Sequence, residues 1–589
     1  MNMKLQTLIS SSLMIGCACL SMSSCSDDDT PVTTGDDYKY VGQSIGNFDK
    51  SEWYPGGELG TTDNVGAKCY DSEAPAVTQQ GLSNEFKHGE MFFERDFNGS
   101  TKPFAGLGPA SVRKSCMDCH PGYGHGKWQN KYTATNGNGY LLVVYHPNDG
   151  ANSNDGPYNQ QVTGMPQTQA ASPFLPPIEE SGIHISWSEV AAMPSGLPMK
   201  FPDGTPYSLQ YPVVTIDDDA FHTNPKPTNL AFRLESTIGI IGTGLIDAID
   251  EQDIIDQYKE EAASLKKAGL DVSEYLNPQF WDSSKGDMAE GAFYSFSVAG
   301  RLADGSYPTT RPFTQTDGSV KEVPAMLKRY TYALTRATLQ DGPGANAIWN
   351  ITNVTRSDRP KLYTTTAWAT AMSEEPSVIA KIRADHTSPY WADTDEKIAE
   401  KVKYLLDPST NQLNNKYGTF APEMTDNDYY DFMVWHRGLA IPRARNLNDP
   451  EVQLGKKVFM QIGCTQCHRP SWNTGKDNYW TSDNIKGKAL PRYANQKIYP
   501  YSDFVQHKLY MENDIHNSWC RTTPLWGRGL STINTGRGDR LHDCRARNEI
   551  EAIMWHGYSK KSHAYNAAVK FYNLSTRERN AVVKFLQSI

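Results

Sequence analysis

The sequence predicts a mainly α-helical protein built from two small units that share one motif, the first enlarged by an insertion of loops and strands. Three observations support this. The pattern C-x-x-C-H occurs twice, at Cys116–His120 and at Cys464–His468. Amphipathic helical stretches precede both motifs. A segment from Pro147 to about Pro225, rich in Asn, Gly, Pro and Gln, is too long and turn-rich for a linker.

Length and charge narrow the class of protein. The chain has 589 residues, enough for several domains with their own cores. Its formal net charge of −10 argues against a nucleic-acid partner and favours a redox partner that docks through a basic face.

The N-terminus is typical of an export signal. Lys4 precedes an apolar stretch from Leu5 to Leu20, and small residues lead to Cys25 and an acidic run. This resembles a bacterial lipoprotein signal, with residues 1–24 as signal peptide, Cys25 as lipid anchor and residues 25–72 as an acidic tether. We therefore expect an exported protein held in the bacterial cell envelope, at the outer membrane on its periplasmic or surface side, and attached to the membrane only through lipid. Cys17 is a competing lipidation site, and secretion without lipid is the alternative.

The first unit is expected to span residues 73–445, with the insertion at about 140–230. Ser83 is expected to cap a helix that reaches Phe97. Strands are predicted at Tyr140–Tyr145 and within Tyr207–Ile216. Further helices are predicted at Ile238–Ile249, Gln252–Ala268, Met326–Leu339 and Asn427–Arg437, the last closed by Gly438. No internal repeat is evident beyond the C-x-x-C-H motif.

The second unit is expected at residues 446–589. Asp449 suits a helix N-cap and Pro450 the first helical position, and an apolar stripe from Leu454 to Ile462 follows. At the other end, Ser575 and Glu578 form a capping box that opens a closing helix. A helix leading into C-x-x-C-H and a closing helix that crosses it resemble a cytochrome c domain.

C-x-x-C-H is the spacing at which c-type haem is attached. The thiols of each motif, Cys116 with Cys119 and Cys464 with Cys467, would add to the porphyrin vinyl groups. The following histidines, His120 and His468, would bind the iron. The motifs therefore predict two covalently attached haem c groups. A zinc site made from the two cysteine pairs is disfavoured, because a histidine directly follows each pair.

The sixth ligand on each iron decides between electron transfer and chemistry. The candidates in the second unit are His507, His516, Met511, His542, Met554 and His556. His542 is favoured as a ligand or pocket residue because Asp543 could orient its ring, and His507 ranks second. His125 lies on a glycine-rich loop close behind His120, and we interpret it as structural.

Three further cysteines remain in the exported part. Cys520 and Cys544 are the natural disulfide pair, with two inert thiols as the alternative. A catalytic dithiol is disfavoured because they lack C-x-x-C spacing. Cys69 has no assigned role.

Several stretches carry a family resemblance: Gly106–Pro109 with the first motif, Phe201–Pro212, Ala231–Ile249, Gly438–Arg443, Gly455–His468, Pro500–Asp503, Arg521–Gly527, Leu541–Arg547 and Glu551–Gly557. They resemble bacterial di-haem oxidoreductases described as peroxidases and sometimes labelled thiol oxidoreductase-like. More distantly the chain is similar to di-haem cytochrome c peroxidases. The resemblance covers most of residues 80–589 and is thin between about 285 and 425.

The chain departs from this family at several points. Cys544 stands where a glycine is usual, and His507-Lys508-Leu509-Tyr510 replaces a His-Asp-Met-Gly segment. The family's Gly-Arg-Phe-Gly-Trp-Lys segment is not evident before Leu339. The change at His507–Tyr510 removes a methionine that could have ligated iron. The name thiol oxidoreductase-like finds no support in this chain, because haem attachment accounts for both C-x-x-C pairs.

The resemblance implies a peroxidase-like oxidoreductase in which one haem reacts with hydrogen peroxide or another small oxidant. The other haem would relay electrons from an external donor such as a small cytochrome. Arg521 or Arg545, with a pocket glutamate, could stabilise the leaving hydroxide. A pure electron-transfer cytochrome with both irons six-coordinate is one alternative, and a surface lipoprotein for iron or haem handling is another.

Overall fold

The computed structural model describes residues 48–97, 108–132, 139–147, 159–295, 310–315, 317–478, 481–515 and 518–589. The predicted signal peptide, Cys17, Cys25 and His516 lie outside these ranges. The helices are α3 (Gly57–Gly60), α4 (Pro75–Gln79), α5 (Ser83–Glu94), α6 (Thr243–Asp247), α7 (Glu251–Lys267), α8 (Val272–Tyr275), α9 (Ile348–Thr352), α10 (Thr366–Glu374), α11 (Pro376–Ala384), α12 (Asp395–Leu406), α13 (Asp426–Arg437), α14 (Pro450–Gln461), α15 (Ser531–Thr535), α16 (Glu549–His556), α17 (Tyr565–Tyr572) and α18 (Thr576–Ser588).

Strands are numerous and short. They are β1 (Thr61–Thr62), β2 (Ala110–Ser111), β3 (Tyr140–Tyr145), β4 (Gln169–Ala170), β5 (Ile183–Glu189), β6 (Gln210–Ile216), β7 (Ala231–Ser236), β8 (Trp281–Asp282), β9 (Asp287–Met288), β10 (Phe293–Ser295), β11 (Thr310–Thr314), β12 (Val320–Leu327), β13 (Asn414–Asn415), β14 (Gly418–Thr419), β15 (Ile441–Pro442), β16 (Trp472–Asn473), β17 (Lys497–Ile498), β18 (Gln506–Lys508) and β19 (Trp519–Arg521). Over the described ranges they pair into one three-stranded and eight two-stranded sheets. The fold is therefore mixed, and the prediction of a mainly α protein is wrong in this respect.

Two predicted helices differ from the structure. Met326–Leu339 is not a helix, because its apolar start is the end of strand β12 and turns follow. Ile238–Ile249 is helical only within α6. Short apolar runs fit a buried strand or loop as well as a helix, and tertiary pairing decides between them.

The predicted capping residues at the second motif are confirmed. Asp449 caps α14 by accepting a hydrogen bond from the backbone of Glu451, and Pro450 is the first helical residue. Ser575 and Glu578 form the capping box of α18. Ser83, by contrast, is the first residue of α5 rather than its cap.

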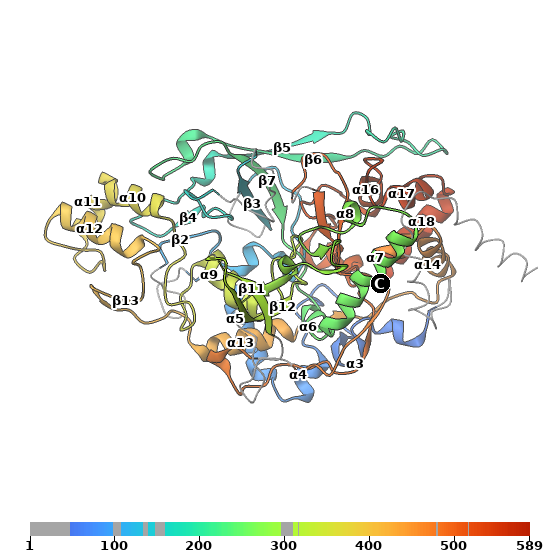
Figure 1. The fold of residues 1–589 in the computed structure, drawn as a ribbon, viewed down its shortest axis with the longest axis horizontal. Helices are drawn as coiled ribbons and strands as arrows, with labels where there is room; N and C mark the ends of the chain where they lie inside the picture. The colour runs from blue at the N-terminus through green and yellow to red at the C-terminus, as the bar shows by residue number, and fades with distance from the viewer. Residues whose placement is uncertain are drawn as a thin grey trace, which may run out of the picture.

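The insertion forms two antiparallel strand pairs, β3 with β7 and β5 with β6. The long β5–β6 pair runs across the top of the molecule in Figure 1 and reaches over the C-terminal helices. Residues between these two strands, among them Val190, Phe201 and Leu209, join the core around α14 and α18. The insertion therefore covers the second unit as well as the first.

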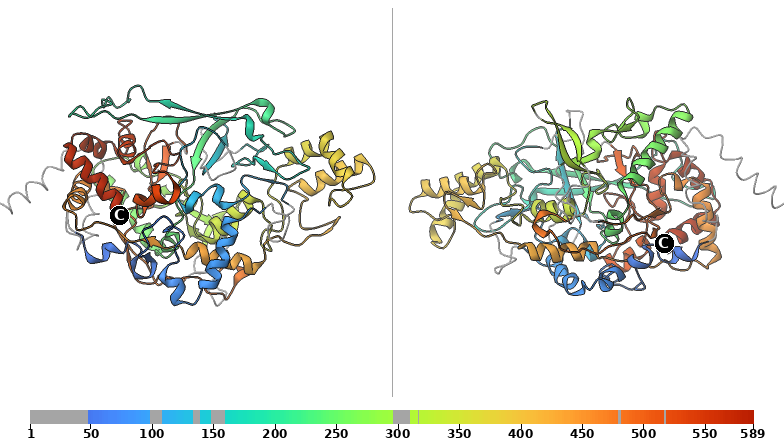
Figure 2. Two further views of the ribbon diagram at one scale, coloured as in Figure 1. Left: turned by 180° about the vertical axis from the view of Figure 1, so that it is seen from behind. Right: turned by 60° about the horizontal axis from the view of Figure 1, so that its bottom comes forward.

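Packing crosses the predicted boundary between the units. The largest core surrounds α5 and α13 but also takes in Trp472, Phe504 and Trp526 from beyond residue 446. A separate core lies among α10, α11 and α12, which project at one end of the molecule in all views (Figures 1 and 2).

Part of the predicted tether is packed. Glu52 is 4% exposed, and Lys456 Nζ on α14 lies 2.9 Å from its Oε1. This buried ion pair joins residues 48–53 to the second unit. Among the described helices, none is both long and apolar enough to cross a membrane.

Candidate functional site

Both C-x-x-C-H motifs form the same local structure. The first three residues of each are a single 3₁₀ turn, Cys116–Asp118 and Cys464–Gln466. Gly463, with φ of 93°, makes the left-handed bend that leads from α14 into the second turn. All four cysteines are free thiols, as attachment to a porphyrin requires.

The two motif histidines are anchored in the same way. His120 Nδ1 lies 3.0 Å from the carbonyl oxygen of Ile238, and His468 Nδ1 lies 3.1 Å from that of Tyr501. A carbonyl only accepts hydrogen bonds, so Nδ1 carries the proton and Nε2 keeps its lone pair. Burial lowers the pKa of each ring to about 4, which keeps it neutral. This is the orientation in which histidine binds a metal.

Each motif follows a helix that crosses a second helix at a glycine. α5 crosses α13 at Gly89, where an added Cβ would lie 2.0 Å from the carbonyl oxygen of Asp431. α14 crosses α18 at Gly455, where the same distance to Ala581 is 1.9 Å. Only glycine allows the backbones to approach this closely.

The crossing brings an aromatic ring beside each motif histidine. Phe93 and Phe459 stand four residues after the two glycines, with ring centroids 5.9 Å from His120 and 6.1 Å from His468. The two units therefore repeat one arrangement. Sequence reasoning missed this repeat, although the pattern Gly-x-x-x-Phe occurs before each motif and could have indicated it.

A cavity of about 210 Å³ lies beside the second motif. Its wall includes Cys464, Cys467 and His468, together with Phe459, Leu509 and Leu586. The thiols, the anchored imidazole and an apolar wall suit a covalently attached porphyrin.

His556 lies in the same cavity wall as His468. Its Nδ1 lies 2.7 Å from the carbonyl oxygen of Ala552, so it donates there and leaves Nε2 with a lone pair. Burial, and then the proximity of His556, lowers the pKa of His468. His556 was one of six sequence candidates for the sixth position. The fold places it in the cavity wall with an Nε2 that can bind iron.

His436 is the corresponding histidine near the first motif. It lies on α13, is 4% exposed, and neither ring nitrogen has a hydrogen-bond partner within the described residues. Burial first, and His120 second, lower its pKa to about 3. A buried, unpartnered imidazole beside His120 fits a haem-ligating role. Sequence reasoning overlooked His436 because this histidine lies within a helical stretch of mostly apolar and aromatic residues.

Each of the two histidines favoured from sequence has a ring nitrogen paired with an aspartate. His507 Nε2 lies 2.7 Å from Asp503 Oδ2, and Cys467 lies close by. His542 lines the cavity, but its Nδ1 faces Cys520 Sγ at 3.5 Å and its Nε2 faces Asp514 Oδ1 at 2.7 Å. Iron ligation by either ring would require it to leave these contacts, whereas a place for both histidines in the haem pocket agrees with their positions in the cavity wall, and both roles stay predictions.

The two arginines predicted to assist peroxide cleavage lie in different places, and only one of them lines the cavity. Arg521 lines the cavity, is 3% exposed, and burial lowers its pKa to about 10. Its Nε donates to the carbonyl of Thr331, while its Nη1 has no partner in the described ranges. Arg545 is instead bound to Asp543 and does not line this cavity.

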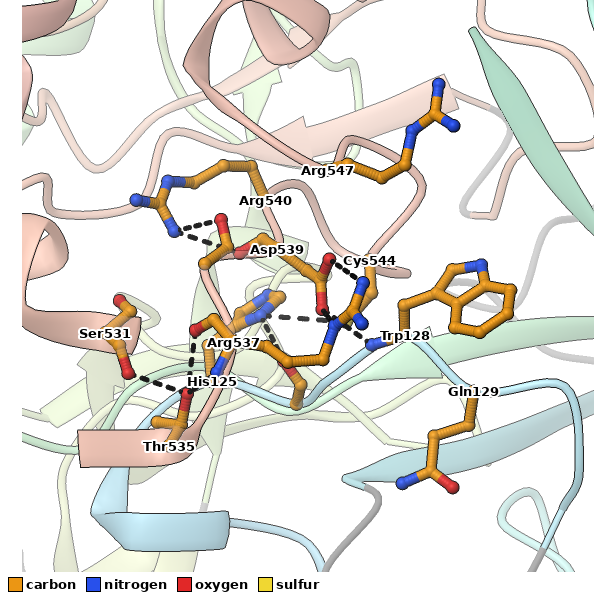
Figure 3. Close-up of polar contacts among 12 residues, drawn as sticks. His125, Trp128, Gln129, Ser531, Thr535, Arg537, Asp539, Arg540, Cys544 and Arg547 are labelled. Carbon is orange, nitrogen blue, oxygen red and sulfur yellow. Dashed lines mark hydrogen bonds and ion pairs between the residues drawn. The ribbon is translucent and has the colours of Figure 1, made fainter. Parts of the chain in front are cut away.

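The cysteines predicted to form a disulfide are both free. Cys520 faces His542, whereas Cys544 lies 3.7 Å from His125 Nδ1, so each thiol has its own imidazole. Figure 3 shows Cys544 and His125 together behind the Arg537–Asp539 ion pair. Cys69 accepts a hydrogen bond from Asn534 and is also buried.

His125 makes structural contacts, as the sequence indicated. Its Nδ1 lies 3.0 Å from the carbonyl of Gly126, and its Nε2 accepts from the phenol of Tyr332 at 3.1 Å.

Residues 395–589, about a third of the chain, match the model of the family described as "di-haem oxidoreductase, putative peroxidase". The matched part holds the second motif, His556 and the residues that line its cavity, apart from Tyr332. No curated protein matches the chain. The family match supports a general oxidoreductase or peroxidase-like role.

Proposed function

We propose that the protein is an exported c-type cytochrome with two covalently attached haems and a peroxidase-like oxidoreductase activity. The observation that carries this is the pair of anchored histidines. In both C-x-x-C-H motifs a backbone carbonyl fixes Nδ1 and leaves a neutral Nε2 to bind iron. The cavity beside the second motif and the family match over the same residues support it.

Cys464, Cys467 and His468 would hold one haem, and Cys116, Cys119 and His120 the other. When bound, haem supplies one-electron redox chemistry and the iron at which a peroxide is cleaved. The chain's own residues orient the imidazole, exclude water and supply charge. We assign the reaction to the second motif because the described cavity lies there.

Arg521 is the cavity residue best suited to assist O–O cleavage. Within the described part of the chain, Nη1 of its guanidinium has no hydrogen-bond partner and lies in a buried wall, so it can stabilise the departing hydroxide without first leaving another partner. Glu549 and Arg540 line the same cavity, with Arg540 Nη2 2.6 Å from Glu549 Oε1. They provide a polar pair through which protons can enter.

Reduction of hydrogen peroxide to two waters takes two electrons and two protons. An external donor, such as a small cytochrome with a basic face, would deliver the electrons one at a time to the first motif.

Haem content and peroxide reactivity test this proposal. The purified protein should contain two haems per chain, and Cys116→Ser or Cys464→Ser should each remove one covalent attachment. Mixing the reduced protein with hydrogen peroxide in a stopped-flow instrument should oxidise haem faster than buffer alone. A protein without covalent haem, or one unaffected by peroxide, would refute the proposal.

An electron-transfer cytochrome with both irons six-coordinate is the second candidate. The specific observation in its favour is that His436 and His556 lie near the two motif histidines. Paramagnetic resonance with only low-spin haem, together with no carbon monoxide binding by the ferrous protein, would select it.

The variant His556→Ala helps to distinguish a peroxide-reactive protein from a pure electron-transfer cytochrome. It should create a new carbon monoxide-binding haem, because it removes the cavity imidazole with a free Nε2. His563→Ala is the matched control, since His563 lines the same cavity but has both ring nitrogens hydrogen-bonded, to the amide of Lys508 and the carbonyl of Glu274.

We further propose attachment to the bacterial envelope through a lipid on Cys25. Cys25→Ser should release the mature protein from the membrane fraction, and unchanged fractionation would contradict the anchor.

A further inference from the structure

A cysteine, a histidine and an aspartate form a row that leads into the wall of the cavity beside the second motif. Cys520 Sγ lies 3.5 Å from His542 Nδ1, and the opposite ring nitrogen, Nε2, lies 2.7 Å from Asp514 Oδ1. Cys520 and His542 line the cavity, whereas Asp514 does not. The imidazole therefore stands between a thiol at the cavity and a carboxylate away from it.

The fold holds the thiol and the ring in place. Cys520 is the middle residue of strand β19, which pairs with β18. The ring of His542 packs edge-on against Tyr332 with centroids 5.8 Å apart, and its backbone carbonyl accepts a hydrogen bond from the amide of Ser236. A nucleophile in contact with a base, which a third group orients in turn, is the arrangement that activates catalytic cysteines.

The aspartate determines which ring nitrogen carries a proton. Burial acts to raise the pKa of Asp514, but His542 and Arg545 hold it below its usual value, so the carboxylate is ionised. A carboxylate only accepts hydrogen bonds, so Nε2 carries the hydrogen and Nδ1 is left to take the proton of the Cys520 thiol. Burial acts to lower the pKa of His542, yet Cys520 and Asp514 raise it well above its usual value, so the ring can hold that proton.

The position of the thiol limits the substrate to a small molecule. Cys520 is 9% exposed, and the cavity of about 210 Å³ that it faces is shared with the second C-x-x-C-H motif. We propose that Cys520 is a nucleophile for hydrogen peroxide or another small hydroperoxide, with His542 as its general base and Asp514 as the residue that positions the base. This reaction does not rest on the proposed function, because neither haem takes part in it.

The reaction is a two-electron oxidation of the sulfur. His542 Nδ1 takes the proton of the Cys520 thiol, and Sγ attacks one peroxide oxygen. The S–O bond forms as the O–O bond breaks, and the leaving hydroxide takes the proton from His542 and departs as water. Arg521, the next residue in the chain and also in the cavity wall, brings a positive charge that favours this hydroxide. One thiol and one hydrogen peroxide thus become one sulfenic acid and one water.

The pair of Cys544 and His125 has the same residue types but the opposite placement of the proton (Figure 3). Cys544 Sγ also faces Nδ1, at 3.7 Å, but this nitrogen donates to the carbonyl of Gly126 and Nε2 accepts from the phenol of Tyr332. His125 therefore has no lone pair to offer the thiol, and Cys544 is fully buried. Cys544 is the natural control for Cys520.

A third group, Cys467 with Asp503 and His507, repeats the three residue types. Cys467 belongs to the second C-x-x-C-H motif, where attachment of haem converts the thiol to a thioether. A thioether has no proton to give up and forms no sulfenic acid. Cys520 is therefore the cysteine of this cavity wall that we expect to react with peroxide in the holoprotein.

Trapping of the sulfenic acid in the holoprotein tests the proposal. After exposure to an equal amount of hydrogen peroxide in the presence of dimedone, peptide mass spectrometry should find the adduct on Cys520 and not on Cys544. Cys520→Ser should lose this adduct, and Cys544→Ser is the matched control that should keep it. His542→Asn should slow its formation about 10²-fold, which is the contribution of a general base. The Soret absorbance of each variant reports its haem content, so a misfolded variant is recognised.

The pH dependence of Cys520 alkylation by iodoacetamide tests the positioning role of Asp514. Asp514→Asn should move the midpoint of this reaction to higher pH, because a neutral amide no longer stabilises the protonated ring. The other charged groups that act on the thiol and the ring stay in place in this variant, namely Glu235, Asp543 and Arg545.

Three results would overturn the assignment: a wild-type protein without the adduct on Cys520, an unchanged rate in His542→Asn, or an unchanged midpoint in Asp514→Asn. Oxidation of haem by peroxide is followed separately by its absorbance. Failure of the proposed function is therefore distinguishable from failure of the thiol reaction.

Discussion

Replacing Gly455 by alanine should separate the two helices that position the second motif. An added Cβ would lie 1.9 Å from the carbonyl oxygen of Ala581 and 2.8 Å from the Cβ of Phe585. The first contact is with backbone, so no side-chain rotation relieves it. α14 and α18 would have to move apart by about 1.5 Å to reach an ordinary contact of 3.4 Å.

The cost follows from two opposing effects. Alanine at a helix interior is favoured over glycine by about 1 kcal/mol. Overpacking a buried contact costs about 1–3 kcal/mol and occasionally more, and a backbone clash of this depth belongs at the upper end. We therefore expect a net loss of about 2 kcal/mol in the free energy of unfolding.

The midpoint of guanidinium unfolding, followed by far-ultraviolet circular dichroism, measures this loss. Gly89→Ala should behave alike, because the same crossing recurs between α5 and α13. Gly239→Ala is the control, since nothing lies within 4 Å of its added Cβ and its φ is ordinary. A Gly455→Ala protein as stable as the control would refute the reasoning that the helices meet at this glycine.

Three further predictions concern buried charges. Lys456→Met should destabilise by about 3–5 kcal/mol because it leaves Glu52 buried without its partner, and adding Glu52→Gln should restore much of this in denaturant unfolding. Burial raises the pKa of Glu423 to about 7, so the folded protein holds a proton that the unfolded chain loses near pH 4.5. Stability should therefore fall by up to about 3 kcal/mol as pH rises from 4.5 to 7, and Glu423→Gln should remove this slope in unfolding curves measured against pH. Arg521→Gln should slow haem oxidation by peroxide about 10²–10³-fold in stopped-flow mixing without loss of haem, and an unchanged rate would exclude it from the reaction.

Helix ends could be predicted from the sequence because they depend on local interactions. Asp449, Pro450 and the Ser575 capping box act within one helical turn, so their roles do not depend on distant residues. The strand pair β3–β7 joins residues some 90 positions apart, and only its first strand was predicted. The predicted helix Met326–Leu339 begins with the last two residues of β12, because the length of an apolar run alone does not distinguish a strand from a helix.

The residues around the predicted haems were less accessible to sequence reasoning. His120 and His468 follow from the motif, but their anchoring carbonyls come from Ile238 and Tyr501, which no spacing rule identifies. Choosing His556 among six candidates required knowing which ring nitrogens are occupied. The aspartate beside His542 in the sequence suggested an oriented ring, whereas the closer partner is Asp514.

The two units share a helix crossing but differ at one position on it, and this difference bears on which iron reacts. Asp431 and Ala581 face the two crossing glycines, so His436 on α13 corresponds to Leu586 on α18. His436 therefore stands in the last turn of α13, directly after Trp435, which packs against Gly89 of α5 at the crossing. In the second unit that position is apolar, and His556 instead ends the short helix α16 at the cavity wall. Both histidines thus lie in a last turn, but α16 has only eight residues against the 12 of α13, and a shorter helix has fewer backbone hydrogen bonds to break before its end opens. We therefore expect the second site to exchange its imidazole for a peroxide more readily, while the first remains closed and relays electrons.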